Sequence, residues 1–297
     1  MNMKFSTIAL GAAAMLALGS CDKNDEQASE AAKSISVNTH IGPMTRVATN
    51  GNSSVFEDGD KISVYAWTGT ADLVNTSGMV VNNAINTLNG TKWTPEPMMK
   101  WTDMTTPHFF LSVYPDRSIT NFTTDAVKVD PAKQMESDLL VAVNTGAEKK
   151  GLIATNNPVS LNFDHMMSML VVQFTYRDEF SEIPLVTSVS TEATCDGTID
   201  YLQGIITPTG DSVIFGLPVV KANEQYASVI LPQAIQQVTV VINGKNYIYT
   251  HPTPLILQKG KIQTIKLIVG RNRIELDQVT ISDWVNELPI EGGEAVD

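Results

Sequence analysis

The chain has 297 residues, of which 43% are hydrophobic and 18% are charged, and its formal net charge is -12. This composition is that of a folded globular protein, long enough for one large or two ordinary domains. The acidic balance excludes the basic surface with which proteins hold nucleic acids or anionic membranes.

The N-terminal residues carry the most specific motif of the chain. Lys4 supplies a positive charge, and an apolar run from Ile8 to Leu18 follows it, which is typical of a signal peptide. The run is too short to cross a bilayer as a helix, because that takes about 20 apolar residues. Leu18-Gly19-Ser20-Cys21 resembles the lipobox of bacterial lipoproteins, so we expect residues 1–20 to be removed and Cys21 to carry lipid, including palmitate. The alternative is an ordinary signal peptide that leaves a free cysteine.

Residues 21–46 are expected to form a tether followed by a leader strand. The residues directly after the cysteine are charged and polar, so they cannot build a core and predict a flexible tether. Ser34–Thr39 then places Ile35 and Val37 on one face, which indicates a short strand. Arg46 stands downstream among small, polar and turn-forming residues, which predicts an exposed loop.

Period-two alternation dominates the rest of the chain, whereas helical periodicity is nearly absent. In Lys61–Trp67 every second side chain is Ile, Val or Ala, which predicts a half-buried strand. Val238–Thr250, with Asn243-Gly244 at its centre, predicts a hairpin with a type I′ turn. Further predicted strands are His108–Tyr114, Leu139–Val143, Val159–Phe163, Met169–Tyr176, Tyr226–Leu231 and Ile262–Val269. Many short strands between turn-forming clusters indicate an all-β fold of the sandwich or barrel kind.

A polar stretch at residues 144–158 suggests where the folded part divides. It is rich in Gly, Asn and charged residues and is longer than a hairpin needs. It predicts an N-terminal β-sandwich (residues 47–156) and a C-terminal β-sandwich (residues 157–297), each of ordinary domain size. Phe163, together with Leu170 and Val172, is expected in the core of one domain.

Motifs for catalysis and for cofactor or metal binding are missing. The chain has no P-loop, dinucleotide fingerprint, zinc-protease motif or serine-hydrolase motif, and its histidines lack metal-ligand spacing. One interpretation of Asp164-His165 is an acid–base pair, and the favoured one is a strand-end histidine held by a hydrogen bond. At residues 57–60 a β-turn is favoured over a calcium loop, and Cys195 is expected to be a core or strand thiol rather than a nucleophile. We therefore expect neither an enzyme nor a cofactor.

Two tryptophans leave a second interpretation open. Trp93 and Trp101 are candidates for a stacking surface that binds glycans, since aromatic faces pack against the C–H surfaces of sugars. In β-sandwich proteins, aromatic side chains more often fill the core. Exposed rings would therefore favour glycan binding, and buried rings would favour a structural protein.

Several motifs carry a resemblance to a known family. In chain order they are Thr45-Arg46 ahead of Phe56–Val64, Lys100-Trp101, His108–Pro115, Asp138–Ala142, Val159–Leu170, Ile230–Gln233, Gly260-Lys261 and Ile281–Trp284. In order and spacing they resemble the fimbrillin-like (Mfa-like, FimA-type) family of fimbrial subunit lipoproteins of Bacteroidetes. Asp211-Ser212-Val213 also resembles the O-glycosylation motif of that phylum, which makes Ser212 a candidate site.

The resemblance implies two tandem transthyretin-like β-sandwich domains and a structural or adhesive role as a tip, accessory or stalk subunit of a fimbria. It implies a lipid-anchored protein, exposed at the cell outer membrane, that joins other subunits by donor-strand exchange and meets a host or bacterial surface ligand. It also implies cleavage by a trypsin-like protease between Arg46 and Val47, which would release the leader strand from a groove.

The residues after Trp284 depart from that pattern. Pro289 and the Gly292-Gly293 pair make them a poor donor strand, which counts against a stalk role and leaves the tip and accessory roles open. The alternative function is a surface glycan-binding lipoprotein of a nutrient-uptake system, and a cell-surface hydrolase is the least favoured.

Overall fold

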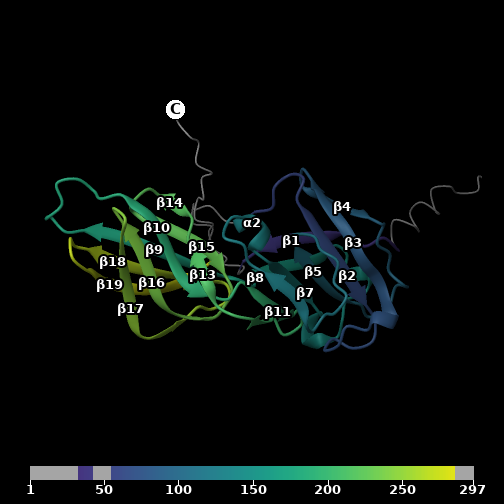
Figure 1. Cartoon of the computed structure of the whole chain (residues 1–297). Coiled ribbons are helices and arrows are strands. Elements are labelled where there is room, and N and C mark those ends of the chain that lie inside the picture. The colour runs from purple at the N-terminus through teal and green to yellow at the C-terminus, as the bar shows by residue number, and fades with distance from the viewer. Residues whose placement is uncertain (1–32, 43–54, 285–297) are drawn as a thin grey trace, which may run out of the picture.

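The computed structural model describes residues 33–42 and 55–284, which form an almost entirely β-stranded molecule (Figure 1). The all-β class predicted from alternation is therefore confirmed. The helical segments are short: α2 (Gln134–Ser137) and the 3-10 turns Thr76–Gly78, Ala147–Lys149 and Ala154–Asn156. Within the described ranges, no helix is both long enough and apolar enough to span a membrane.

Four sheets contain the described strands. The seven-stranded sheet has the order β1 (Val37–Ile41), β8 (Val159–His165), β7 (Leu140–Asn144), β5 (Phe109–Tyr114), β2 (Lys61–Trp67), β3 (Met79–Asn89) and β4 (Lys92–Glu96). The five-stranded sheet has the order β14 (Val219–Lys221), β15 (Gln225–Ile230), β9 (Ser168–Tyr176), β18 (Lys261–Val269) and β19 (Ile274–Asp283). The four-stranded sheet has the order β13 (Val213–Gly216), β10 (Val186–Ala193), β16 (Ala234–Ile242) and β17 (Lys245–Ile256). The three-stranded sheet has the order β12 (Ile205–Thr209), β11 (Asp196–Asp200) and β6 (Asp125–Lys128).

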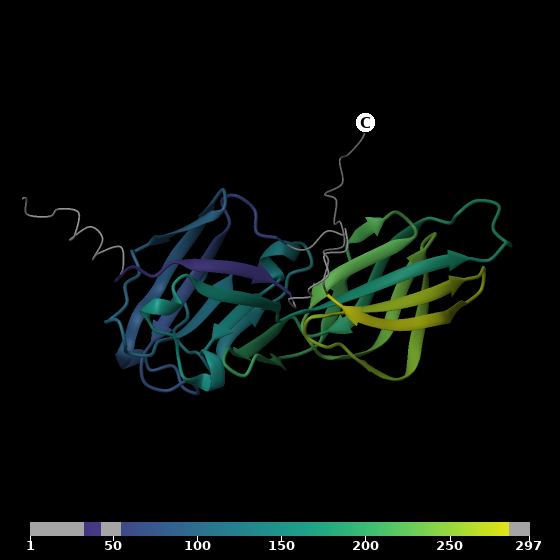
Figure 2. The same ribbon diagram turned by 180° about the vertical axis from the view of Figure 1, so that it is seen from behind.

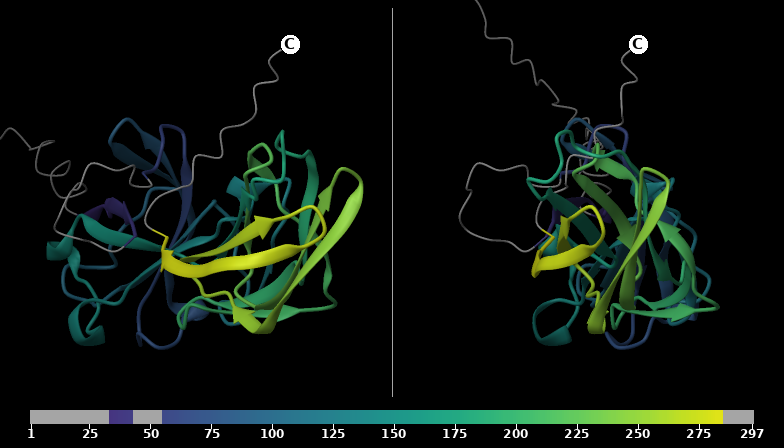
Figure 3. Two further views of the ribbon diagram at one scale, coloured as in Figure 1. Left: turned by 90° about the vertical axis from the view of Figure 1, so that its left-hand side faces the viewer. Right: turned by 60° about the vertical axis from the view of Figure 1, so that its left-hand side comes forward.

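The molecule has two halves that lie end to end (Figures 1 and 2). The N-terminal half ends with β8 and contains the seven-stranded sheet, whereas the C-terminal half begins with β9 and contains the four- and five-stranded sheets. The yellow hairpin of β18 and β19 lies in the C-terminal half (Figure 3). β6 comes from the first half and pairs with β11 of the second, with Val127 opposite Gly197, so the three-stranded sheet joins the halves.

The polar stretch at residues 144–158 does not separate the two halves. β7 precedes it and β8 follows it, and both belong to the seven-stranded sheet, where Leu140 pairs with His165. Within the stretch, Leu152 forms a two-way backbone bridge with His108, at 2.8 Å in each direction, so the segment folds back along β5. The chain changes sheet after β8, at Met166-Met167, and the predicted boundary between residues 156 and 157 lies inside the first half. The division into two independent domains stays a prediction.

The predicted strands and the predicted hairpin occur in the structure. Lys61–Trp67 is reproduced without a shift, and the other predicted strands match β5, β7, β8, β9, β15 and β18 to within two residues at each end. In the hairpin of β16 and β17, Asn243 and Gly244 have φ values of 48° and 77°, as a type I′ turn requires.

Two apolar clusters form the core, and the seven-stranded sheet lies between them. Val64 of β2 belongs to the cluster that contains the leader strand, and Tyr65 belongs to the cluster that extends into the C-terminal half; both side chains are fully buried. The prediction that β2 is half-buried is therefore wrong. The Tyr65 hydroxyl donates to the carbonyl of Arg117 and accepts from the amide of Ile119, each at 2.8 Å. The loop that follows β5 therefore covers the face of β2 on which Tyr65 lies.

The same arrangement separates three residues that were expected to share one core. Phe163, Leu170 and Val172 are fully buried, which confirms that they face a core. Phe163 belongs to the cluster of the leader strand, whereas Leu170 and Val172 belong to the other cluster. The reason is the change of sheet between β8 and β9, which the sequence pattern does not mark.

Candidate functional site

Residues 33–42 bond to the first half at two places, the chain beyond β4 and strand β8. At its start, the amide of Ile35 donates to the carbonyl of Met99 at 2.9 Å, and the amide of Trp101 donates to the carbonyl of Lys33 at 2.8 Å. Further on, β1 runs parallel to β8, with partners from Val37 opposite Val159 to the end of the strand. We call residues 33–42 the leader segment. It pairs with the chain just beyond β4 at one edge of the sheet and with β8 at the other, and Figure 2 shows β1 in purple across the first half.

The side chains of the leader segment alternate as the sequence predicts. Ile35 and Val37 are 2% and 6% exposed and belong to the first half's core, whereas Asn38 and His40 are exposed. This confirms a strand with Ile35 and Val37 on its buried face. The regular strand spans Val37–Ile41 rather than Ser34–Thr39, because the first residues of the leader pair with a different neighbour.

Trp93 connects the leader segment to β4. Its indole Nε1 donates to Thr39 Oγ1 at 3.0 Å, and its side chain is 6% exposed. The ring of Phe56 packs edge-on against Trp93 with 5.3 Å between centroids, and in the same way against Phe163 at 5.2 Å. These contacts between aromatic rings fix the orientation of the indole beside the leader segment.

Trp101 is also buried, with 3% of its surface exposed. Its ring packs edge-on against His108 at 5.0 Å and against Phe110 at 5.6 Å. Because Trp93 is buried as well, neither ring presents a face on which a sugar could stack. The burial of both rings therefore contradicts the glycan-stacking interpretation and supports the structural one.

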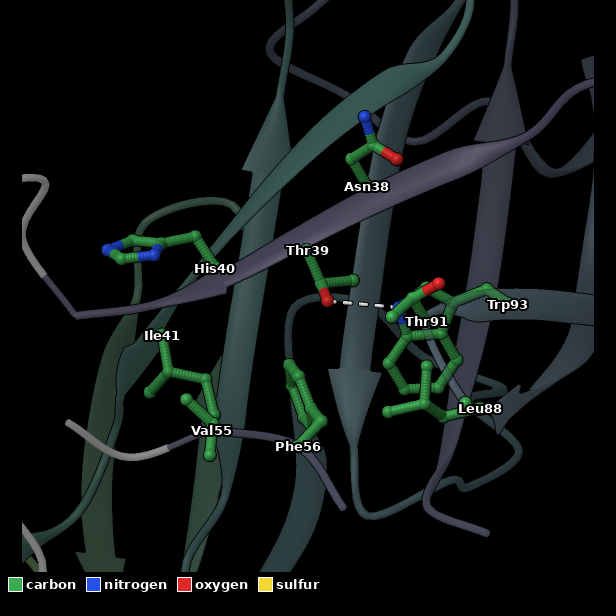
Figure 4. A pocket seen from close by; sticks show the side chains of 10 residues that line it. Asn38, Thr39, His40, Ile41, Val55, Phe56, Leu88, Thr91 and Trp93 are labelled. Atoms are coloured by element: carbon green, nitrogen blue, oxygen red, sulfur yellow. Dashed lines mark hydrogen bonds between the residues drawn. The ribbon is translucent and has the colours of Figure 1, made fainter. Parts of the chain in front are cut away.

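A cavity of about 350 Å³ lies beside the end of β1. Figure 4 shows Thr39 and Ile41 directed toward it, whereas Asn38 and His40 lie on the other side of the strand. The other residues that line the cavity are Asn38, His40, Val55, Phe56, Leu88, Gly90, Thr91 and Trp93. Thr39 and Ile41 are half-buried, so the buried face of the leader is filled at its start and incompletely filled at its end.

His165 is a structural residue of the junction between the halves. Its Nδ1 lies 2.9 Å from Oδ2 of Asp138, and its ring stacks on Trp284 with 4.2 Å between centroids and 8° between planes. Its side chain is 4% exposed, whereas Asp164 is exposed on the other face of β8. The prediction of a hydrogen-bonded strand-end histidine is confirmed, and an acid–base pair with Asp164 is wrong because successive residues of a strand face opposite sides.

The remaining candidates for chemistry have structural roles in the described part of the chain. Residues 57–60 form the predicted β-turn, in which the amide of Asp60 donates to the carbonyl of Glu57 at 3.0 Å and Gly59 has a φ of 95°. No group of three or more metal-binding side chains gathers within residues 33–42 and 55–284. Cys195 is half-buried, and burial raises the pKa of its thiol, which disfavours the reactive thiolate.

Several predicted sites lie outside the described residues or stay predictions. The signal peptide, Cys21 with its lipid, and the cleavage site between Arg46 and Val47 are outside the described ranges. Ser212 is exposed just before β13, and its glycosylation stays a prediction.

Sequence reasoning missed the bond between Trp93 and Thr39 and the pairing of Ile35 with Met99. The residues that make the bond are 54 positions apart, and no local pattern joins them.

The fold is similar to that of solved structures of bacterial surface proteins. A candidate cell adhesion protein from Bacteroides ovatus has a TM-score of 0.64 at 16% identity, covering 86% of this chain and 99% of that one. A second candidate cell adhesion protein, from Bacteroides uniformis, has a TM-score of 0.63 at 18% identity, covering 77% and 93%. The tip fimbrial protein Mfa3 from Porphyromonas gingivalis, with a C-terminal truncation, has a TM-score of 0.50 at 10% identity, covering 77% and 95%. At these identities the similarity shows a shared fold.

The sequence itself assigns the family. No curated protein sequence matches the chain significantly. The sequence profile described as fimbrillin-like matches residues 45–284, which is most of the chain and includes both halves of the fold. The chain therefore belongs to the fimbrillin-like family.

Proposed function

We propose that this protein is a structural and adhesive subunit of a fimbria, without enzymatic activity, that is anchored to the bacterial outer membrane through Cys21 until cleavage after Arg46 and is then assembled by strand exchange. The observation that carries the proposal is the position of the leader segment. It pairs with β8 through β1 and with the chain beyond β4 through Lys33 and Ile35, and it precedes Arg46 in the chain. A single cut after Arg46 would leave the leader held by noncovalent contacts alone.

Release of the leader would create the kind of surface that accepts a strand from another subunit. β8 would lose its parallel partner, and Met99 and Trp101 would lose backbone hydrogen bonds to Ile35 and Lys33. The core positions now covered by the buried side chains of the leader would open to water. Such an edge, with unpaired backbone groups above an apolar groove, favours pairing with an incoming strand.

Attachment before cleavage protects the same edge. While the leader is in place, β8 and the chain beyond β4 have backbone partners, and Ile35 covers the core with 2% of its surface exposed. In this proposal the uncut protein is exported as a monomer, and cleavage both frees it from its lipid anchor and exposes the groove. The proposed partners are other fimbrial subunits, and adhesion to a host or bacterial ligand completes the role.

The alternative function, a surface glycan-binding lipoprotein, loses the residues on which it depended. It required exposed rings at Trp93 and Trp101, and both are buried in the first half's core. The similarity of fold to a tip fimbrial protein and to candidate adhesion proteins supports the fimbrial proposal instead.

The test is controlled cleavage after Arg46. An arginine-specific protease should produce a new N-terminus at Val47, and the cut protein should form oligomers that the uncut protein does not form. Arg46→Lys is the matched control, because it keeps the positive charge but resists this protease. Cut protein that stays monomeric at high concentration, or normal filaments on cells carrying Arg46→Ala, would show that strand exchange after cleavage is wrong for this chain.

A further inference from the structure

We propose that the groove under the leader segment selects the incoming strand by its side chains as well as by its backbone. The selected strand runs parallel to β8 and carries apolar residues at the registers of Ile35 and Val37. It carries Ser or Thr at the register of Thr39 and an apolar residue larger than isoleucine at the register of Ile41. This inference rests on the strand exchange proposed above and names the chemistry of the partner that the groove accepts.

The first two registers follow from burial. Ile35 and Val37 are 2% and 6% exposed, and they pack in the cluster that also contains Met99, Val159 and Phe163. A polar side chain at either register would lie in an apolar core without a hydrogen-bond partner, which is strongly unfavourable. The exposed positions that follow each of them, Ser36 and Asn38, set no such requirement.

The requirement at the register of Thr39 comes from Trp93. An indole N–H is a donor that cannot accept, and the structure gives it Thr39 Oγ1 as acceptor at 3.0 Å. Trp93 is 6% exposed, and its ring is packed edge-on against Phe56, so it does not turn its N–H to solvent. An incoming strand with valine at this register would have the same shape as threonine and would leave the donor buried without a partner.

The requirement at the register of Ile41 comes from the cavity. About 350 Å³ of space adjoins the half-buried side chains of Thr39 and Ile41, and Phe56 and Leu88 contribute apolar surface to its wall. A larger apolar side chain at this register would bury surface that Ile41 leaves open, which stabilises the bound strand. The leader therefore fits the start of the groove closely and its end loosely, and a better-fitting strand displaces it.

The experiment measures how the groove ranks strands. The full chain, with a site-specific protease sequence inserted at Arg46, is cut and then incubated with fluorescent peptides that carry residues 33–42. We expect the Thr39→Val peptide to bind about tenfold more weakly than the parent peptide, whereas the Thr39→Ser peptide keeps the acceptor and binds like the parent. We expect the Ile41→Phe peptide to bind at least threefold more tightly. The Ser36→Ala peptide changes an exposed side chain that does not line the cavity, and it is the matched control.

A variant of the protein tests whether the weaker binding of the Thr39→Val peptide comes from the lost hydrogen bond to Trp93. Trp93→Phe keeps an aromatic ring and removes the N–H, so the parent and Thr39→Val peptides should bind this variant equally well. Its melting temperature and its affinity for the Ser36→Ala peptide establish that the groove is intact. If Trp93→Phe does not fold, the Ser and Val peptides on the unsubstituted protein still decide whether an acceptor is required.

The outcomes distinguish the inference from the proposal beneath it. If no peptide enters the cut protein, strand exchange itself is wrong. If the peptides enter but the Thr39→Val and Ile41→Phe peptides bind like the parent, strand exchange stands and side-chain selection is wrong. Selection through Trp93 is also wrong if the penalty for Thr39→Val persists in the Trp93→Phe protein.

Discussion

The two halves of the molecule complete their sheets in different ways. In the C-terminal half, β16 and β17 are joined by a two-residue turn, and β18 pairs with the next strand, β19. In the N-terminal half, β1 pairs with β8, and Val37 lies opposite Val159. The outer strands of the second half are therefore held by nearby segments, whereas β1 in the first half is held by a strand that lies far away in the chain.

The outer strands of the two halves also differ in how deeply their side chains are buried. β19 is an edge strand with exposed side chains: Ile281 is 52% exposed, and Asp283 pairs with Lys261. Charged residues along an exposed edge discourage pairing with another chain. The leader segment, in contrast, buries Ile35 and Val37 in the core. Under the proposed strand exchange, the first half would accept a strand from another subunit, whereas the second half would keep its own strands.

The largest expected effect is a core truncation beneath the leader segment. Phe163 is fully buried, lies opposite Ile41 in the ladder and contacts Phe56, so Phe163→Ala should lower the free energy of unfolding by about 3–5 kcal/mol. Leu170→Ala, in the other core cluster, should cost about 2–5 kcal/mol. Denaturant unfolding measures both losses. After cleavage, Phe163→Ala alone should release the leader faster, and equal release from the two variants would contradict the comparison.

The next largest effect is the loss of stability when a side chain of the leader segment is truncated, compared with the same truncation on β19 of the other half. Ile35→Ala removes a side chain that is 2% exposed and should cost about 2–3 kcal/mol of unfolding free energy. Ile281→Ala, on β19, removes a side chain that is 52% exposed and should change stability by less than about 0.5 kcal/mol. Thermal melts of the two variants side by side provide the measurement. Similar losses would mean that the two strands are held equally firmly.

A smaller effect tests the local closure of the second half. Gly244 has a φ of +77° with no atom within 4 Å of an added Cβ, so Gly244→Ala introduces backbone strain without a clash. We expect a loss of about 1–2 kcal/mol, because other residues enter this conformation at that cost. Gly216→Ala, on β13 with equally open surroundings and without a positive φ, is the matched control and should be close to neutral. Equal melting temperatures for the two variants would show that the conformation of this turn does not contribute to the stability of the second half.

The sequence predicts those parts of this fold that depend on neighbouring residues. Alternation locates most of the strands, and Asn243-Gly244 locates the turn, because both signals act over a few residues. The boundary at residue 156 was misplaced because a polar excursion within one sheet has the same composition as a linker. Burial on both faces of β2 was missed because Tyr65 looks polar-facing in the pattern, although its hydroxyl is satisfied inside the protein.

The candidate site was predictable in one part and not in another. The alternation of Ile35 and Val37 with polar residues predicts a strand with one buried face. The sequence does not predict the partners of this strand, because the pairing with Met99 and with β8 joins segments that are far apart in the chain. The role of Trp93 as donor to the leader depends on that pairing and needs the three-dimensional structure.

The smallest effect concerns pH and the place where the leader enters the first half. His108 is fully buried, and burial lowers the pKa of its imidazole, although the Thr106 carbonyl and the Asp103 carboxylate oppose the shift. Trp101, whose amide donates to Lys33 of the leader, packs edge-on against this ring at 5.0 Å. A proton on His108 therefore adds a charge to a buried site next to the leader's first contacts.

The sign of the pH effect follows from the lowered pKa. The unfolded chain protonates His108 near the ordinary value of about 6.5, and the folded chain protonates it only at lower pH. The contribution of neutral His108 to stability is therefore complete above that value and declines as the pH falls below it, by at most about 1.4 kcal/mol per pH unit. Urea unfolding between pH 7.5 and 5 should show a shallower decline for His108→Gln than for the unsubstituted protein. If the unfolding free energies of the two proteins fall in parallel, His108 contributes nothing to the acid sensitivity of this half. If His108 does contribute, cleaved protein should release its leader segment faster at pH 5.5 than at pH 7.5.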